Sequence, residues 1–154
     1  MAKVAKKAAS KKVKEVNPEK KTASKKVASK KVKEVNTEKV QNLQDAIVLG
    51  MQEKKALDIT IIDLQGLRNS IADYFIICSG NSGTQVDAIT DSIEKEVFKL
   101  TSENPWHKEG KQNNEWVLLD YVNVVVHVFI QERRKFYGLE ALWGDAKITN
   151  IENQ

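Results

Sequence analysis

Apolar residues recur at helical intervals in two long stretches of the chain. The first stretch predicts a helix that begins near Thr37 and has one apolar face, made by Val40, Leu43, Ile47 and Met51. The second predicts a helix with a longer stripe, made by Val86, Ile89, Ile93, Val97 and Leu100. Ser82 and Gln85 form a capping box at its start, and Asn104-Pro105 ends it. Both stripes are expected to face a core.

Shorter apolar runs predict four β-strands, at residues 57–64, 72–78, 116–119 and 124–130. The last run, VVVHVFI, is apolar on both faces apart from His127, which indicates a central strand. The polar residues 106–114 predict a loop. Residues 132–142 predict a last helix that brings Phe136, Leu139 and Trp143 together.

These elements follow the order α-β-β-α-β-β-α, which predicts an α/β (α+β) fold with a single mixed β-sheet and helices packed on it. A chain of 154 residues has room for one hydrophobic core and little more. We expect the folded domain to span residues 39–145. Residues 146–154 are short and polar, and we expect a flexible C-terminal end.

Residues 1–38 have the composition of a lysine-rich tail. The segment ASKKVKEVNPEK at residues 9–20 recurs as ASKKVKEVNTEK at residues 28–39. Its isolated Val and Ala residues are too few to offset the entropy of ordering, so the tail is expected to be disordered. Residues 1–40 carry 14 Lys and 4 Glu, which leaves a net charge of −6 for the rest. Clustered Lys favours nonspecific contact with RNA phosphate, and a purely solubilising role fits equally well.

Several classes of protein are excluded by composition. No apolar run reaches the roughly 18 residues of a membrane span, and the start lacks the apolar stretch of a secretory signal, so we expect a soluble, cytoplasmic protein. The single cysteine, Cys78, lies in an apolar run, where a buried thiol is expected. His107 and His127 have no metal-ligand spacing, and we expect neither a metal nor a cofactor.

Two segments resemble one known family. Residues 116–143 read WVLLDYVNVVVHVFIQERRKFYGLEALW, in which a Trp-led strand, an Asp-Tyr turn, a V-V-H-V-F strand, an Arg-Tyr helix and L-E-x-L-W follow without a gap. Residues 56–80 add the IADYF entry and the CSG exit of an earlier strand. Together they resemble the ribosomal silencing factor family (RsfS, or Iojap-like) from about residue 40 to residue 145. The lysine-rich tail lies outside the resemblance.

The resemblance implies a repressor of translation rather than an enzyme. A member of this family is expected to bind the large ribosomal subunit through ribosomal protein fourteen and to block association with the small subunit. The implied partner-binding residues lie near the third strand, with three aromatic residues from elsewhere: Trp116, Leu118, Asp120, Tyr121, Tyr74, Tyr137 and Trp143. Trp116 follows a polar loop, so we expect it to be half exposed and to act as an anchor, although each aromatic residue fits core packing equally well.

One position departs from the family pattern. The family usually has an acid where this chain has Asn123, commonly preceded by Gly where this chain has Val122. Asn123 keeps an oxygen acceptor and tolerates left-handed backbone, but any role that needs a negative charge at this turn is in doubt.

Two alternatives remain open. The family's fold resembles nucleotidyltransferases, and Ser79-Gly80-Asn81-Ser82 before a helix would suit such a magnesium-dependent enzyme. The required pair of carboxylates is missing, because Glu115 and Asp120 are five residues apart and fall on opposite faces of a strand. A general RNA-binding protein is the other alternative, and it rests on the lysine-rich tail alone. His127 fits a hydrogen-bonded residue of the sheet, and Asp73 a capping or turn acid.

Overall fold

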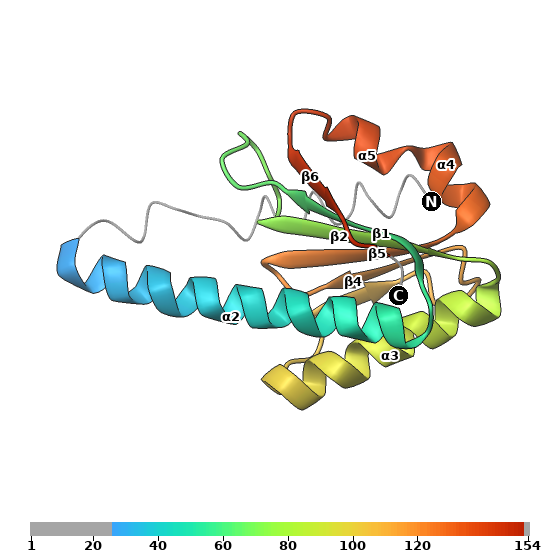
Figure 1. Ribbon diagram of the computed structural model, residues 1–154, viewed down its shortest axis with the longest axis horizontal. Helices are drawn as coiled ribbons and strands as arrows, with labels where there is room; N and C mark the ends of the chain where they lie inside the picture. The colour runs from blue at the N-terminus through green and yellow to red at the C-terminus, as the bar shows by residue number, and fades with distance from the viewer. Residues whose placement is uncertain (1–25, 153–154) are drawn as a thin grey trace.

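The computed structural model describes residues 26–152, with side chains from residue 38 onward. One six-stranded sheet, in the order β3-β4-β5-β2-β1-β6, forms the middle of the molecule (Figure 1). Its strands are β1 (Leu57–Asp63), β2 (Tyr74–Gly80), β3 (His107–Glu109), β4 (Trp116–Asp120), β5 (Val124–Ile130) and β6 (Lys147–Asn150). Only β2 and β5 pair in parallel among these strands, so the sheet is mixed, as predicted.

Two long helices cover one side of the sheet, which we call the helical face (Figure 1). They are α2 (Lys26–Glu53) and α3 (Gly83–Thr101), and their predicted stripes are buried from Val40 to Met51 and from Val86 to Val97. Leu100, predicted as the last residue of the second stripe, is instead 60% exposed. Gly50 lets the two helices approach closely, because a Cβ at this position would lie 2.6 Å from the Cα of Ile93. The predicted N-cap is confirmed, because Gln85 N–H donates to Ser82 Oγ (3.1 Å). The return bond of the capping box is shifted by one residue, since Gln85 Oε1 accepts from Asn81 N–H (2.7 Å) and not from Ser82.

Two short helices and a loop cover part of the opposite side, which we call the aromatic face because Trp116, His127 and Phe129 lie on it. The helices are α4 (Gln131–Tyr137) and α5 (Leu139–Leu142), and both lie across the sheet from α2 and α3 (Figure 1). The predicted central position of β5 is confirmed, because Val124 to Phe129 are all buried and β5 has a neighbouring strand on each side.

The prediction of one continuous helix over residues 132–142 is wrong. Gly138 takes a left-handed conformation (φ 54°), which ends α4 before α5 begins. The two helices do not share one continuous apolar stripe: Phe136 on α4 is exposed, while Leu139 on α5 is buried. The expected grouping of Phe136 with Leu139 and Trp143 therefore does not form.

Two edge strands are not predicted by the sequence pattern. The polar segment 106–114 contains β3, whose three residues pair with Leu118 to Asp120. The C-terminal end, which we expected to be flexible from residue 146, contains β6, whose residues pair antiparallel with Thr60 to Asp63 of β1. Both strands are short and polar because an edge strand needs only backbone pairing on one side.

The boundary expected at residue 38 also differs, since α2 begins at Lys26. The rest of the predicted disordered tail, residues 1–25, lies outside the described residues, as does the end at residues 153–154. None of the helices within residues 26–152 is long and apolar enough to cross a membrane.

Candidate functional site

Trp116 is buried at the centre of the aromatic face. Its exposed fraction is 1%, and its ring stacks on Phe129 with centroids 4.8 Å apart and lies 4.9 Å from Tyr137. The expectation of a half-exposed anchor is therefore wrong. The register explains the difference, because Trp116 pairs with Phe129 of the central strand β5 and does not project from the end of the preceding loop. Leu118, two residues on and on the same face, is fully buried as well.

His127 is the polar member of this aromatic cluster, and its role as a hydrogen-bonded sheet residue is confirmed. Trp116 Nε1–H donates to His127 Nδ1 over 3.1 Å, which places the imidazole proton on Nε2 because indole is only a donor. Burial lowers the pKa of His127 to about 3, so the ring is neutral at physiological pH. Nε2 has no hydrogen-bond partner among the described residues. A buried neutral ring held by Trp116 fits a structural role better than proton transfer.

Asp120 and Tyr121 lead into the tight turn between β4 and β5. Asp120 Oδ1 accepts a hydrogen bond from Val122 N–H (2.8 Å), which holds Val122 at a left-handed φ of 73°. Tyr121 is buried against the helical face, and burial together with Glu94 and Glu103 raises the pKa of its hydroxyl. A hydrogen bond inside the turn therefore holds its conformation. Asp120 and Tyr121, both predicted as partner contacts, are buried.

Asn123 acts in the turn through its backbone. Its carbonyl accepts hydrogen bonds from the N–H groups of Asp73 (2.9 Å) and Tyr74 (3.1 Å), which joins the start of β2 to the start of β5. Any residue type supplies this carbonyl, so the backbone link does not depend on which side chain stands at position 123. The exposed Asn123 side chain contributes no charge to the surface.

The remaining predicted residues are half-buried and lie on different sides of the sheet. Tyr74 packs against the helical face, and its hydroxyl donates to Gln65 Oε1 over 3.2 Å. Tyr137 and Trp143 pack on the aromatic face, where Trp143 meets Phe75 edge-on at 5.8 Å. The structure thus brings Trp116, Leu118, Tyr137 and Trp143 into one cluster and leaves Tyr74 and Tyr121 on the other side. The seven residues do not form one exposed surface.

Sequence reasoning missed the most exposed aromatic side chain. Trp106 is 79% exposed, although its backbone N–H donates to the carbonyl of Asp120 over 2.7 Å. The sequence pattern predicts a polar loop here and gives Trp106 no role. One signal was available in the sequence: Trp106 belongs to none of the periodic apolar patterns that a buried face produces. A Trp outside such a pattern is a candidate for an exposed side chain.

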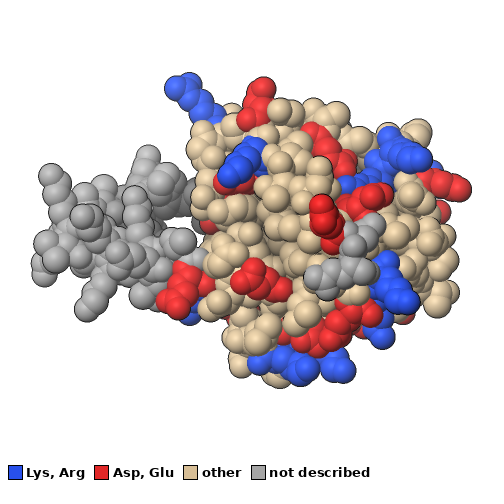
Figure 2. Space-filling view, in the orientation of Figure 1, with Lys and Arg blue, Asp and Glu red and all other residues tan. Residues whose placement is uncertain are grey.

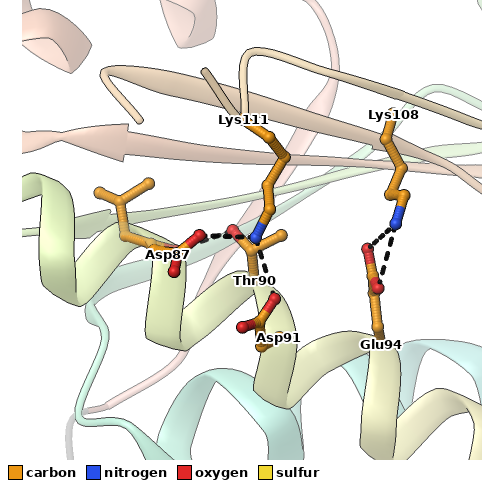
Figure 3. Close-up of polar contacts among 7 residues, drawn as sticks. Asp87, Thr90, Asp91, Glu94, Lys108 and Lys111 are labelled. Atoms are coloured by element: carbon orange, nitrogen blue, oxygen red, sulfur yellow. Dashed lines mark hydrogen bonds and ion pairs between the residues drawn. The ribbon is translucent and has the colours of Figure 1, made fainter. Parts of the chain in front are cut away.

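Ion pairs fix the segment that follows Trp106 to helix α3 (Figure 3). Lys108 Nζ lies 3.2 Å from Glu94 Oε1, and Lys111 Nζ lies 2.7 Å from Asp87 and 2.9 Å from Asp91. Gly110 makes the turn at φ 89°, where a Cβ would collide with the carbonyl oxygen of Trp116 at 1.9 Å. Together these contacts hold β3 in one position on the edge of the sheet.

The turn after β2 does not have the features of a metal-dependent transferase. The Ser82 and Gln85 side chains are used in the cap of α3, and Ser79 Oγ accepts from Arg134 Nη1 over 3.0 Å. Within residues 26–152, no group of three His, Cys, Asp or Glu side chains is placed to hold a metal ion. Glu115 instead lies 3.4 Å from Arg133 in an exposed ion pair.

A cavity of about 830 Å³ lies beside Arg134, between α4–α5 and strands β1 and β6. Arg134 is nearly buried there, and its guanidinium donates four hydrogen bonds, to Asp58 O (2.6 Å), Ser79 Oγ (3.0 Å), Thr60 Oγ1 (3.0 Å) and Glu140 Oε1 (2.7 Å). Its Nη2 also lies 2.7 Å from Glu140 Oε1. These contacts join α4–α5 to the sheet.

Charged side chains of both signs are interspersed on the face shown in Figure 2. That face carries no broad basic area of the kind that tracks a nucleic-acid backbone. Buried Cys78, whose pKa burial raises to about 12, adds no reactive thiol.

Comparison with known proteins gives a consistent result. The family model described as ribosomal silencing factor during starvation (RsfS) matches residues 37–154. The chain is 39% identical over 112 residues to ribosomal silencing factor RsfS of Halalkalibacterium halodurans. The aligned region covers 73% of this chain and 94% of that relative. The chain is 42% identical over 103 residues to the protein of the same name from Bacillus subtilis, covering 65% of this chain and 83% of that one.

Solved structures and a more distant relative agree. A crystal structure of a protein from Chromobacterium violaceum is similar with a TM-score of 0.63 at 33% identity, covering 68% of this chain and 85% of that chain. The chain is also 32% identical over 101 residues to mitochondrial assembly of ribosomal large subunit protein 1 of mouse, covering 64% of this chain and 44% of the relative. The family match spans both motif segments and every described strand, and the chain belongs to the ribosomal silencing factor (RsfS) family.

Proposed function

We propose that this protein silences ribosomes by binding the large ribosomal subunit at ribosomal protein fourteen, where it blocks association with the small subunit and so represses translation. The observation that carries the proposal is the family match over residues 37–154, which includes the whole folded body from Val40 to β6. The names of two relatives, which refer to ribosomal silencing and to assembly of the ribosomal large subunit, support the proposal. The cytoplasm is the proposed location because the proposed partner is the ribosome.

A rigid body is what such a role requires. Silencing by obstruction needs no chemical step, only a folded domain that occupies the surface where the small subunit would sit. Helices lie on both faces of the sheet (Figure 1), and α4–α5 are joined to it through Arg134. Binding such a preorganised body costs little ordering entropy. Outside residues 1–40 the chain has a net charge of −6, which suits a partner that is basic because it binds ribosomal RNA.

The test is co-sedimentation with isolated ribosomal subunits followed by a joining assay. We expect the protein to sediment with large subunits, and to reduce the fraction of joined ribosomes when small subunits are added. A large subunit lacking ribosomal protein fourteen provides the control for the binding site. Sedimentation with small subunits alone would overturn the proposal.

We propose that the role is non-enzymatic. The Ser79–Ser82 turn caps a helix, and Glu115 and Asp120 lie on opposite faces of their strand. We therefore expect no transfer from any nucleoside triphosphate in the presence of magnesium or manganese. Metal-dependent labelling that survives purification and is lost in Asp120→Ala would support the nucleotidyltransferase alternative instead.

A further inference from the structure

Four exposed apolar side chains lie on segments that lead to the end of β4 and the start of β5. Trp106 (79% exposed) and Val122 (38%) lie on either side of the β4 terminus, because Trp106 N–H binds the Asp120 carbonyl and Val122 N–H binds the Asp120 carboxylate. Phe98 (52%) and Leu100 (60%) lie on the last turn of α3, which leads through residues 102–105 to Trp106. We call this set of four the Trp106 end. Trp106 and Val122 are both bonded to Asp120, and a Trp exposed to this extent beside a second exposed apolar side chain has the character of an interaction surface.

The Trp106 end is held in place by contacts that do not involve the exposed side chains. The ion pairs of Lys108 and Lys111 fix β3 and its turn to α3 (Figure 3). The Asn123 carbonyl joins the β4–β5 turn to Asp73 and Tyr74 at the start of β2. A surface that is already ordered loses little entropy on binding, which favours a stable complex.

Apart from α2, the strand ends and loops at the Trp106 end are acidic. Residues 63–74, 94–109 and 120–123 contain seven Asp and Glu against four Lys and Arg, for a formal net charge of −3 from these side chains. Lys99 and Lys108 are held in ion pairs with Glu96 and Glu94. The pKa values of two tyrosine hydroxyls reflect this negative charge. Burial is the largest cause of both rises. Glu94 and Glu103 further raise the pKa of Tyr121, and Asp63 and Asp73 further raise the pKa of Tyr74.

We infer that the Trp106 end is the surface through which the protein docks on a basic protein partner, with Trp106 as the central anchor. The inference rests on the proposed function, for which the partner is a ribosomal protein that binds RNA. An apolar centre with an acidic surround matches a protein surface that offers an apolar pocket among Lys and Arg side chains. It does not match RNA, whose phosphates the net negative charge repels.

The experiment compares Trp106→Ser with Phe136→Ser. Both residues are highly exposed aromatics, 79% and 75%, so neither change is expected to disturb the fold. Phe136 lies on α4, which follows the far end of β5, and therefore serves as the matched control. Affinity for isolated large subunits is measured for each variant at one ionic strength. We expect Trp106→Ser to weaken binding about thirtyfold, as for an interface anchor, and Phe136→Ser to leave it unchanged.

A charge variant tests the second half of the inference. Glu103→Lys, next to the exposed turn of α3, is expected to weaken binding, and more strongly at low than at high salt because rim electrostatics are screened. Equal binding of wild type and Trp106→Ser would overturn the inference while leaving the proposed function standing. Failure of the wild type to bind large subunits would remove the proposed function itself. A dimer of the protein that Trp106→Ser converts to a monomer, with unchanged ribosome binding, would overturn the inference and assign the surface to a second copy of the chain.

Discussion

The indole of Trp116 and the imidazole of His127 form a hydrogen bond inside the aromatic face. Each group carries a polar atom that would be costly to bury alone, and the 3.1 Å hydrogen bond between them removes part of that cost. The surrounding rings of Phe75, Phe129 and Tyr137 then supply apolar contact to both. The sequence pattern alone does not distinguish a Trp at the start of a strand that faces solvent from one that faces a core. The deciding factor is the strand register, which is a tertiary property.

Replacement of Trp116 therefore tests stability rather than binding. We expect Trp116→Ala to lower the free energy of unfolding by about 3–5 kcal/mol, because it opens a cavity among three aromatic rings and orphans His127 Nδ1. Trp116→Phe, which keeps the ring volume in part, is expected to cost about 1–3 kcal/mol. Chemical denaturation measures both values. Unchanged stability of Trp116→Ala together with abolished ribosome binding would contradict the core assignment and restore Trp116 as an anchor.

His127 makes stability depend on pH. Its pKa is about 3 in the folded protein and near 6.5 in an unfolded chain, so below pH 6.5 the unfolded state binds a proton that the folded state does not. The free energy of unfolding is therefore expected to fall as pH drops from about 6.5 to 3, by up to about 1.4 kcal/mol per pH unit from this residue. His127→Gln, which keeps an acceptor for Trp116 but does not titrate, is expected to show a shallower decline. Denaturation curves at pH 7, 6, 5 and 4 compare the two proteins, and parallel curves would contradict this assignment.

At the scale of elements, long periodic segments were predictable and short edge segments were not. The apolar stripes of α2 and α3 and the apolar run of β5 predict which side chains face the core, because a buried face repeats at the period of its element. Strands β3 and β6 have three and four residues and little apolar side chain to bury, so only their neighbours β4 and β1 make them strands. The candidate site shows the same limit: the strong motif predicts surface contacts for apolar residues that are buried, while exposed Trp106 lies in a segment without a pattern.

Arg134 is the residue that joins α4–α5 to the sheet. Helix α4 buries none of its side chains fully, so the bonds from Arg134 to Thr60, Ser79 and Glu140 carry much of its attachment. We expect Arg134→Ala to lower the free energy of unfolding by about 2–3 kcal/mol, since it removes charged hydrogen bonds to buried hydroxyls. Arg133→Ala provides the control, because its exposed pair with Glu115 is worth less than about 1 kcal/mol. Hydrogen exchange should accelerate in residues 131–143 in the first variant only, and equal protection in both would contradict the role of Arg134.

At the scale of the whole molecule, opposite charges are separated along the chain. Residues 1–38 carry 13 Lys and 4 Glu, whereas the segments around Trp106 are acidic. A negative body suits a basic protein, and a positive extension suits the RNA phosphate that surrounds such a protein on a ribosome. Under the proposed function, we expect the body to supply specificity for the protein partner and the lysine-rich segment to supply salt-dependent attraction to RNA.

Deletion of residues 1–38 separates these contributions. Val40 is the first core residue among the described side chains, so we expect the melting temperature of the deleted protein to match that of the full chain. Ribosome binding should persist and depend less steeply on salt concentration. The slope of log affinity against log salt should fall by roughly 0.7–0.9 for each phosphate that a lysine of the deleted segment neutralises in the full chain. Deletion of residues 1–25 alone keeps all of α2 and removes a smaller share of the lysines, so its slope should be intermediate. An unchanged slope in both deletions would assign the lysine-rich segment a solubilising role, and a cooperative drop in melting temperature would show that it packs on the body.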